Sequence, residues 1–369
     1  MTRTWRWVVV AAVVAVLVGL PSLVRAFPVG QGSGGSAAAL LDRIRASRTH
    51  PYAGYAESTG SLALPTTDQL SDVASLLGGR TQVRAWWRSA DDWRSDTVTP
   101  AGELSTRTSP TQVQVWDFED SDVAVTVADV AGAVRLPRVG DTLPPELAAR
   151  MLNGATAAQV STLPPRRVAG RAADGLRMTP GDPLSSISRV DVWADQASDI
   201  AVLVEVFGRT GDTPALSSTF LDFTDAQPSV QEVAFSPPPG SRVFTRQRYD
   251  LVRAIGQVPD TSLPARLLRF DRTPSQPGLA GIGQYGSGVT QIAVGALPER
   301  AARSLLDQLR LASTAVKLPE GTAISVGPVS LLVTDPQVTG QTWLVAGTLT
   351  PQGLAQAATQ LRPAAGAPS

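Results

Sequence analysis

Arg189-Val-Asp-Val-Trp-Ala-Asp195, followed by Ile200-Ala-Val-Leu-Val-Glu-Val-Phe207, stands at the centre of the stretch that decides the fold, Pro165 to Val243. The stretch consists of short β-branched or aromatic segments, each separated from the next by Gly, Pro, Asp or Ser. Its other segments are Arg167-Val-Ala-Gly170, Gly175-Leu-Arg-Met-Thr-Pro180, Phe220 to Phe223, and Phe235-Ser-Pro-Pro-Pro-Gly240-Ser-Arg-Val243. This pattern is typical of consecutive antiparallel strands joined by tight turns. Because the segments hold neither a nucleophile with a base nor a cluster of metal ligands, the stretch indicates a curved sheet that binds an apolar ligand.

The length and composition indicate two globular domains behind a short N-terminal segment. The chain has 369 residues, of which 43% are hydrophobic and 17% charged, enough for sizeable cores. The formal net charge is zero, so the sequence lacks the basic field of a nucleic-acid-binding protein. The 32 glycines and 29 prolines are spread along the chain, as the turns of a β-rich protein require.

The sequence offers little catalytic chemistry. Cysteine is absent, which excludes thiolate nucleophiles, metal sites built on thiolates, and the acylated cysteine of a lipoprotein anchor. The single histidine, His50, precedes Pro51 and has no convincing serine or cysteine partner, so a surface or capping role is favoured over catalysis. We therefore predict a protein that is not an enzyme, with no cofactor and no metal site.

Residues 1–26 are predicted to form a signal peptide or an N-terminal membrane anchor. Basic residues precede an apolar run from Trp7 to Leu20, and small residues follow at Val24-Arg25-Ala26, where signal peptidase would cleave. Cleavage is favoured over an anchor because the run is short for a membrane span and ends at Pro21. Either alternative places the remaining chain outside the cytoplasm, at the outer face of the cytoplasmic membrane, either anchored or secreted. Residues 27–36, rich in glycine, form a flexible spacer.

Residues 37–245 form the first predicted domain. Its helices are expected over Ala37–Ser47, after Thr67-Asp68 and after Pro144-Pro145-Glu146. Between the helices, the alternation of apolar and polar residues predicts a meander of strands with one face buried. These strands are Tyr52–Leu64, Gln82–Ser89, Trp93–Val98, Thr111–Phe118 and Val123–Val127.

The same domain resembles a known family. The order of Trp193-Ala-Asp195, Val204-Glu-Val206 and Phe235-Ser-Pro-Pro-Pro-Gly240 is similar to the N-terminal domain of RseB/MucB sigma-factor regulators, and to the LolA lipoprotein carrier and actinobacterial LolA-like proteins. The resemblance covers residues 37–245 and implies an unclosed half-barrel whose covering helices enclose an apolar cavity for acyl chains. In the sigma-factor branch, it implies a sensor of lipid or mislocalised lipoprotein that restrains proteolysis of an anti-sigma factor. The turn Gln196–Asp199 departs from that branch, and no residue that would contact an anti-sigma factor can be matched.

Residues 246–363 form the second predicted domain, and residues 364–369 a disordered tail. An internal repeat relates Ala293–Arg310 to Val345–Arg362, each copy comprising a strand, a proline that opens a helix, and an apolar helical stripe. With further strands between the copies, this predicts a small α+β domain with helices on one face of an antiparallel sheet. The predicted fold class is therefore α+β: a LolA-like unclosed antiparallel half β-barrel with covering helices, followed by a small α+β C-terminal domain.

Two motifs that suggest chemistry have better structural explanations. Gly281-Ile-Gly283-Gln-Tyr-Gly286 matches the dinucleotide-binding fingerprint, but a strand follows it where that fingerprint needs a helix, so a glycine-rich hairpin is favoured. The acidic residues of Asp117–Asp122 lack the glycine and the distant glutamate of a calcium loop, so a solvated hairpin tip is favoured.

Aromatic residues supply the candidate ligand site. Trp86, Trp87, Trp116, Phe118 and Trp193 lie on predicted strands of a single sheet. Core packing is the ordinary explanation for any one of them. Because so many exceed the need of one small core, we predict that Trp116, Phe118 and Trp193, with one of the adjacent pair Trp86 and Trp87, line an apolar cavity.

These features predict an exported, non-enzymatic protein that binds lipid or an acylated lipoprotein. The resemblance adds a membrane anti-sigma factor as a partner, and no nucleic acid is expected. The alternative is an envelope lipid or lipoprotein carrier without a signalling role, for which the half-barrel alone suffices, whereas a regulator can use the second domain for partner contact. A hydrolase is retained as a third hypothesis only because Ser, Asp and Glu are plentiful.

Overall fold

The computed structural model describes residues 32, 34–61, 76–98, 102–127, 138–245, 263–273, 282–311 and 315–361. The predicted signal segment and tail lie outside the described residues, as do the connector Tyr249–Gln257 and most of the helix expected after Thr67-Asp68. Within the described ranges, no helix is long and apolar enough to cross a membrane.

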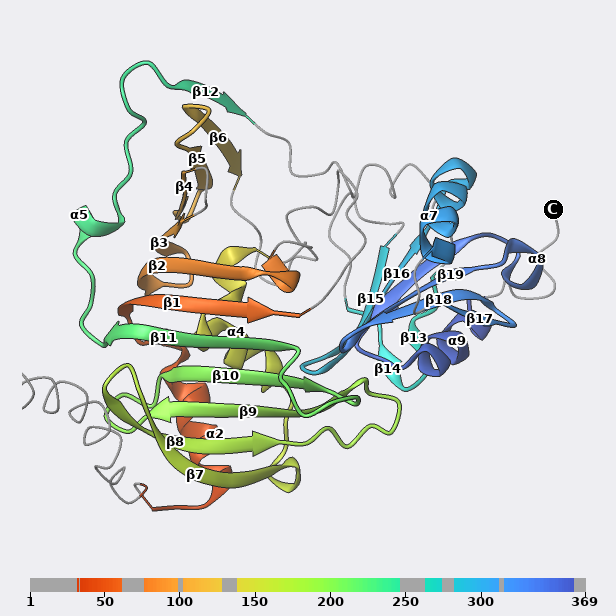
Figure 1. The fold of residues 1–369 in the computed structure, drawn as a ribbon, viewed down its shortest axis with the longest axis horizontal. Coiled ribbons are helices and arrows are strands. Elements are labelled where there is room, and N and C mark those ends of the chain that lie inside the picture. Colours follow the sequence, from red (N-terminus) through yellow and green to blue (C-terminus); the bar gives the residue numbers. More distant parts are fainter. Residues whose placement is uncertain are drawn as a thin grey trace, which may run out of the picture.

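A twelve-stranded sheet dominates the first unit (Figure 1). Its strands in spatial order are β12 (Arg242–Thr245), β6 (Asp122–Val127), β5 (Gln112–Asp117), β4 (Glu103–Thr108), β3 (Asp92–Val98), β2 (Arg80–Ser89), β1 (Tyr52–Gly60), β11 (Leu216–Thr224), β10 (Ala201–Gly208), β9 (Ile187–Asp195), β8 (Arg171–Met178) and β7 (Val160–Val168). All neighbours pair antiparallel except β12 and β6. The edge strands β12 and β7 do not meet in the described sheet, which is therefore unclosed, and the predicted α+β fold with an open antiparallel sheet is confirmed.

The last strand corrects one detail of the sequence prediction. The segment ending at Val243 was expected to continue the antiparallel series, but β12 instead pairs parallel with β6 at the far edge of the sheet. The chain reaches that edge through α5 (Val230–Val233), which contacts β2 and β3. Both sides of β11 are already paired, with β1 and β10, so the segment that follows β11 pairs instead along the free edge of β6.

Two helices cover one side of β7–β11 (Figure 1). Helix α2 (Ala37–Ala46) begins where the Ser36 hydroxyl accepts a hydrogen bond from the Ala39 N–H over 3.2 Å, and α4 (Pro144–Met151) begins with proline. Leu40, Leu41 and Ile44 of α2 join one apolar cluster with alternating valines of β9 and β10. Short 3₁₀ turns connect these elements: η1 (Ser47–Thr49), η2 (Val139–Thr142) and η3 (Ala157–Gln159).

Asp195, the acidic residue of the Trp-x-Asp motif, is a structural residue. The residue is 2% exposed, and its carboxylate accepts two hydrogen bonds from Arg171, over 2.7 and 2.9 Å. It also accepts from the backbone N–H groups of Ala197 and Ser198, which fixes the turn leading to β10. Burial alone would raise the pKa of Asp195, but the hydrogen bonds from Arg171 and Ser198 outweigh burial and hold that pKa below its ordinary value.

Asp195→Asn is expected to lower the free energy of unfolding by about 2–3 kcal/mol, because two charge-assisted hydrogen bonds are lost and Arg171 retains only its pairing with Asp225. The lowered pKa means that the wild-type carboxylate stabilises the fold above the ordinary carboxyl pKa, and that this stabilisation disappears as the pH falls through the lowered value. Urea unfolding at neutral and acid pH checks both statements. A difference between variant and wild type that persists undiminished at the acid end would contradict the role of the ionised carboxylate.

A six-stranded antiparallel sheet forms the second unit. Its strands in spatial order are β15 (Ile282–Ser287), β16 (Thr290–Ala296), β20 (Trp343–Gly347), β19 (Val329–Thr334), β18 (Gly321–Val326) and β17 (Val316–Leu318). The remaining elements are the β13–β14 hairpin (Arg266–Leu267 and Phe270–Asp271) and helices α7 (Glu299–Leu311), α8 (Pro336–Thr339) and α9 (Pro351–Thr359). The predicted glycine-rich hairpin is confirmed, because residues 282–286 of the fingerprint lie in β15, which turns directly into β16.

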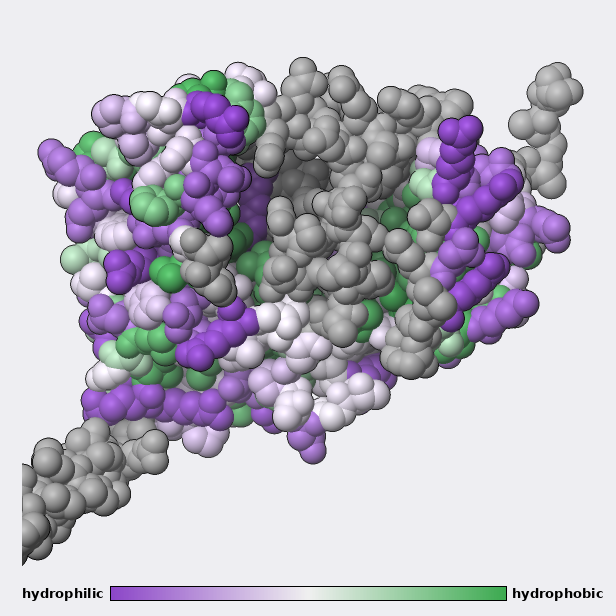
Figure 2. Space-filling model, turned by 45° about the horizontal axis from the view of Figure 1, so that its top comes forward, coloured by the Kyte–Doolittle hydropathy of each residue, from purple (hydrophilic) through white to green (hydrophobic). Residues whose placement is uncertain are grey.

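The two long helices of this unit lie on opposite faces of the sheet, so the prediction of helices on one face was wrong. Leu332 of β19 belongs to the apolar cluster under α9, whereas Val333 belongs to the cluster under α7. Consecutive apolar residues point to opposite faces of a strand, so this strand needs cover on both sides. The outer face of α7 is hydrophilic (Figure 2), and its exposed residues include Arg300 and Arg303.

Candidate functional site

The second unit inserts a hairpin tip into the core of the first. Val289, in the turn between β15 and β16, is 9% exposed and belongs to the same apolar cluster as Leu152 and Met178 of the first unit. The neighbouring Gly288 has a φ of +62°, and a Cβ atom there would lie 2.1 Å from the carbonyl oxygen of Asn153. This close approach therefore requires glycine.

Backbone hydrogen bonds join the units at a second place. The Ser186 N–H donates to the carbonyl of Thr348, and the Thr350 N–H donates to the carbonyl of Leu184, each over 2.9 Å. The Ser186 hydroxyl also donates to the carbonyl of Pro328, in the turn between β18 and β19. Apolar insertion and directed hydrogen bonds thus fix the two units against each other.

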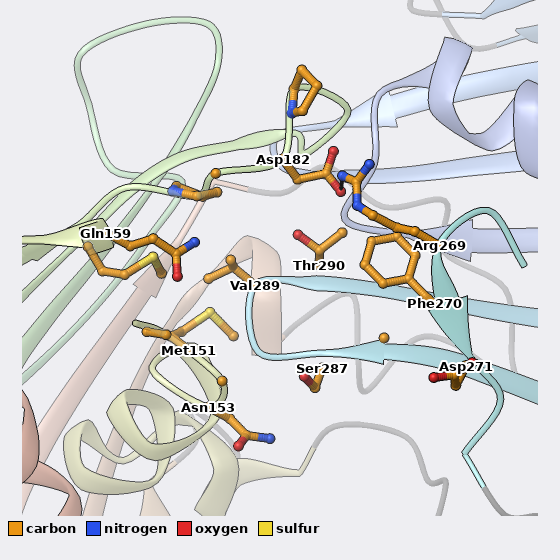
Figure 3. A pocket seen from close by; sticks show the side chains of 17 residues that line it. Met151, Asn153, Gln159, Asp182, Arg269, Phe270, Asp271, Ser287, Val289 and Thr290 are labelled. Carbon is orange, nitrogen blue, oxygen red and sulfur yellow. Dashed lines mark ion pairs between the residues drawn. The ribbon is translucent and has the colours of Figure 1, made fainter. Parts of the chain in front are cut away.

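A cavity of about 620 Å³ lies at this junction (Figure 3). The first unit contributes residues around the end of α4 and the loop after β8, and the second contributes the β13–β14 and β15–β16 hairpins. Its apolar lining includes Met151, Met178, Phe270 and Val289. The chain has 3 methionines, and the two that follow Met1, Met151 and Met178, both line this cavity. Because methionine is flexible and polarizable, such a lining adapts to apolar groups of varied shape.

An ion pair bridges the cavity between the units. Asp182 of the loop after β8 pairs with Arg269 of the β13–β14 hairpin (Figure 3). Asp182 Oδ1 also accepts a hydrogen bond from the Leu184 N–H over 2.8 Å, which holds the carboxylate in place. The Arg269 guanidinium lies 5.1 Å from the centroid of the Phe270 ring. Arg269 is the one cationic side chain among the described lining residues, and Asp182 neutralises it.

Several neutral polar groups of the lining remain available. Gln159 accepts a hydrogen bond through Oε1 from the Thr156 N–H over 2.9 Å, which leaves its Nε2 amide group beside the cavity-lining Gly181. The side chains of Asn153, Ser287 and Thr290 make no hydrogen bond to the described part of the chain. The site therefore combines an apolar lining with amide and hydroxyl groups that a ligand can engage.

Trp87, one of the predicted site residues, lies in an aromatic row packed against η2. Its ring stacks on those of Trp93 and Tyr52, with centroid separations of 5.2 and 5.8 Å, and it is 5% exposed. The Tyr52 hydroxyl has no hydrogen-bond partner among the described residues. Burial, reinforced by the negative charge of Glu146, raises the pKa of Tyr52 well above its ordinary value.

Trp193 is enclosed by its own sheet. Its indole N–H donates to the carbonyl of Pro164 in β7 over 3.1 Å, and the Arg166 guanidinium lies 3.8 Å from its ring centroid. A Cβ atom at Gly175 of β8 would lie 2.8 Å from the indole nitrogen, so glycine makes room for the ring. Trp193 is 2% exposed and is held by packing and by these polar contacts.

The other predicted site residues lie elsewhere on the sheet. Trp116 contacts Phe118 edge to face at 5.5 Å and approaches Phe235 at 5.8 Å, and Phe118 is 58% exposed. Trp86 is half-buried, with the Arg94 guanidinium 5.5 Å from its ring centroid.

The structure therefore places Trp87 and Trp193 in one apolar cluster, which also contains Tyr52 and Phe220. Trp116 and Phe118 are in direct ring contact and belong to no such cluster among the described residues. The apolar cavity that the candidate residues were predicted to line stays a prediction. The junction cavity contains none of them and was missed by sequence reasoning. The one usable signal was the position of Met151 and Met178, the only methionines beyond the first residue.

Comparisons with known proteins give likenesses at low identity. No family model and no curated protein matches the sequence. The MucA/MucB complex of Pseudomonas aeruginosa is similar at 16% identity and a TM-score of 0.47, over 87% of this chain and 96% of that one. A structure of MucB alone has 15% identity and a TM-score of 0.42, over 89% and 98%. A LolA superfamily protein from Nitrosomonas europaea has 11% identity and a TM-score of 0.23, over 52% and 92%.

The classes indicated by the sequence resemblance are thus among the structures to which this chain is similar. All three TM-scores lie below 0.5, so these likenesses assign neither a ligand nor a partner to this chain.

Proposed function

We propose that this chain is an exported, non-enzymatic lipid- or lipoprotein-binding protein, whose ligand places an acyl chain in the cavity between the two units. The observation that carries the proposal is the junction cavity itself, with methionines and Val289 in its lining. Its volume of about 620 Å³ falls within the range of about 300–1,000 Å³ typical of small-molecule sites. Each methylene group moved from water into such a lining contributes about 0.8 kcal/mol, so a long acyl chain can supply useful affinity.

The proposal extends to regulation of a membrane anti-sigma factor, a partner that the sequence resemblance over residues 37–245 supports. Residues 37–245 and 246–363 are the two domains of this proposed regulator. Val289 lines the cavity and also belongs to the core cluster of the first unit. A bound acyl chain therefore contacts the group that joins the units, and a ligand that binds one arrangement better shifts the population toward that arrangement. The surface offered to the partner would change with it.

Met151→Trp is expected to weaken acyl binding by about tenfold or more, because the larger ring occupies space that about two methylene groups of the ligand would fill. Titration of the delipidated chain with a fluorescent fatty acid measures this, and the wild-type chain should bind saturably. Leu305→Trp, a similar substitution at a half-buried site on α7 outside the cavity, should leave the affinity unchanged. Equal affinities for Met151→Trp and wild type would place the acyl chain elsewhere.

A further inference from the structure

We propose that the ligand of the junction cavity carries an uncharged, hydroxyl-rich head, as a glycolipid does. This inference rests on the proposed function and adds the chemical class of the head group. It follows from two properties of the described lining. Its charged side chains are paired, whereas the side chains of Asn153, Ser287 and Thr290 make no hydrogen bond to the described part of the chain.

The charged groups of the described lining disfavour an ionic head. A phosphate would have to bind Arg269 and draw it away from Asp182. The side chain of Asp182 is 9% exposed, and its carboxylate would then lack a counter-ion. Removing one member of such a pair leaves an uncompensated charge, which is strongly unfavourable. Asp271, the second acid of the lining, is paired with Arg266 over 2.8 Å. A cationic head therefore has no unpaired carboxylate to meet among the described lining residues.

The neutral groups match a sugar. The amides of Asn153 and Gln159 and the hydroxyls of Ser287 and Thr290 present both donors and acceptors, as successive sugar hydroxyls require. Phe270 lies in the same lining (Figure 3) and offers an aromatic surface to the apolar face of a sugar ring. Met151, the half-buried methionine of the lining, contacts the acyl chain. The lining therefore suits an amphiphile with an apolar chain and a polyhydroxyl head.

The test compares three probes that share a dodecyl chain: dodecyl maltoside, dodecyl phosphate and dodecyltrimethylammonium. Each is titrated into the delipidated full chain below its micelle-forming concentration, with native mass spectrometry as the readout. Dodecyl maltoside is expected to bind about tenfold tighter than either charged probe, the effect of about one or two recovered hydrogen bonds.

Two variants locate the head group. The double variant Ser287→Ala with Thr290→Val should remove most of the preference for the maltoside and leave the binding of dodecyl phosphate unchanged. Ser217→Ala, a hydroxyl deletion on β11 outside the cavity, should keep the preference. Equal affinity for all three probes, tightest binding of a charged probe, or an unaltered preference in the double variant would overturn the glycolipid inference while acyl binding stands. Failure of all three probes to bind the wild-type chain would contradict the proposed function itself.

Discussion

Gly288→Ala is expected to lower the free energy of unfolding by about 4 kcal/mol or more. This figure adds the lost burial of one apolar side chain to the loss of several hydrogen bonds. The added methyl group would lie 2.1 Å from the Asn153 carbonyl oxygen, and backbone atoms cannot move aside as a flexible side chain can. The turn must therefore withdraw and take Val289 out of the apolar cluster of the first unit. Urea unfolding measures the loss. Hydrogen exchange at the Ser186 and Thr350 amides, which bond across the junction, should become faster.

A matched control separates steric contact from backbone strain. Gly170 has a φ of +77°, close to that of Gly288, but a Cβ atom there meets nothing within 4 Å. Gly170→Ala should therefore cost only the backbone penalty of a left-handed alanine, about 1–2 kcal/mol, without faster exchange at the junction. If the two variants lose the same stability and show the same exchange, the hairpin tip does not hold the units together.

Trp193→Ala is expected to lower the free energy of unfolding by about 3–5 kcal/mol, the usual cost of removing a large buried aromatic ring. The ring is 2% exposed, and its removal also leaves the Pro164 carbonyl without the indole donor. Trp86→Ala is the control on the same sheet. Because Trp86 is half-buried and contacts Arg94 mainly through a cation–π interaction, about 1 kcal/mol is expected there.

Binding of the fluorescent fatty acid to the same two variants tests the predicted aromatic cavity. If Trp193 only packs the sheet, the folded fraction of Trp193→Ala should bind the fluorescent fatty acid with wild-type affinity. A variant of near-normal stability that loses binding would instead assign the ring to a ligand site, as the sequence predicted.

Local patterns in the sequence were sufficient to predict the helices, strands and turns whose formation depends on neighbouring residues. The alternation in the Arg189–Asp195 segment predicted β9, and proline at position 144 marked the start of α4. The same logic separated the hairpin at residues 282–296 from a nucleotide-binding loop. In each case the deciding residues lie within one strand or turn.

The candidate site could not be predicted in this way, because its lining joins residues 151–183 to residues 269–290. Nothing in the local pattern around Gly288 reveals that its partner is the carbonyl of Asn153, a contact set by the docking of two units. The surroundings of the predicted aromatic residues depend on distant segments for a related reason. Sequence shows that Trp193 is large and apolar, but only the packing of β7 shows what encloses it.

The insertion of Val289 also bears on the order of folding. Chains are made from the N-terminus, and domains generally fold as they are completed. Here the first unit is complete in sequence at residue 245, yet one member of its apolar cluster arrives only with residue 289. Met178 and Leu152 therefore lack this neighbour until the later hairpin has been made. The first unit therefore leaves the ribosome with one apolar position of its core unfilled, and the synthesis of the β15–β16 hairpin supplies the side chain that fills it.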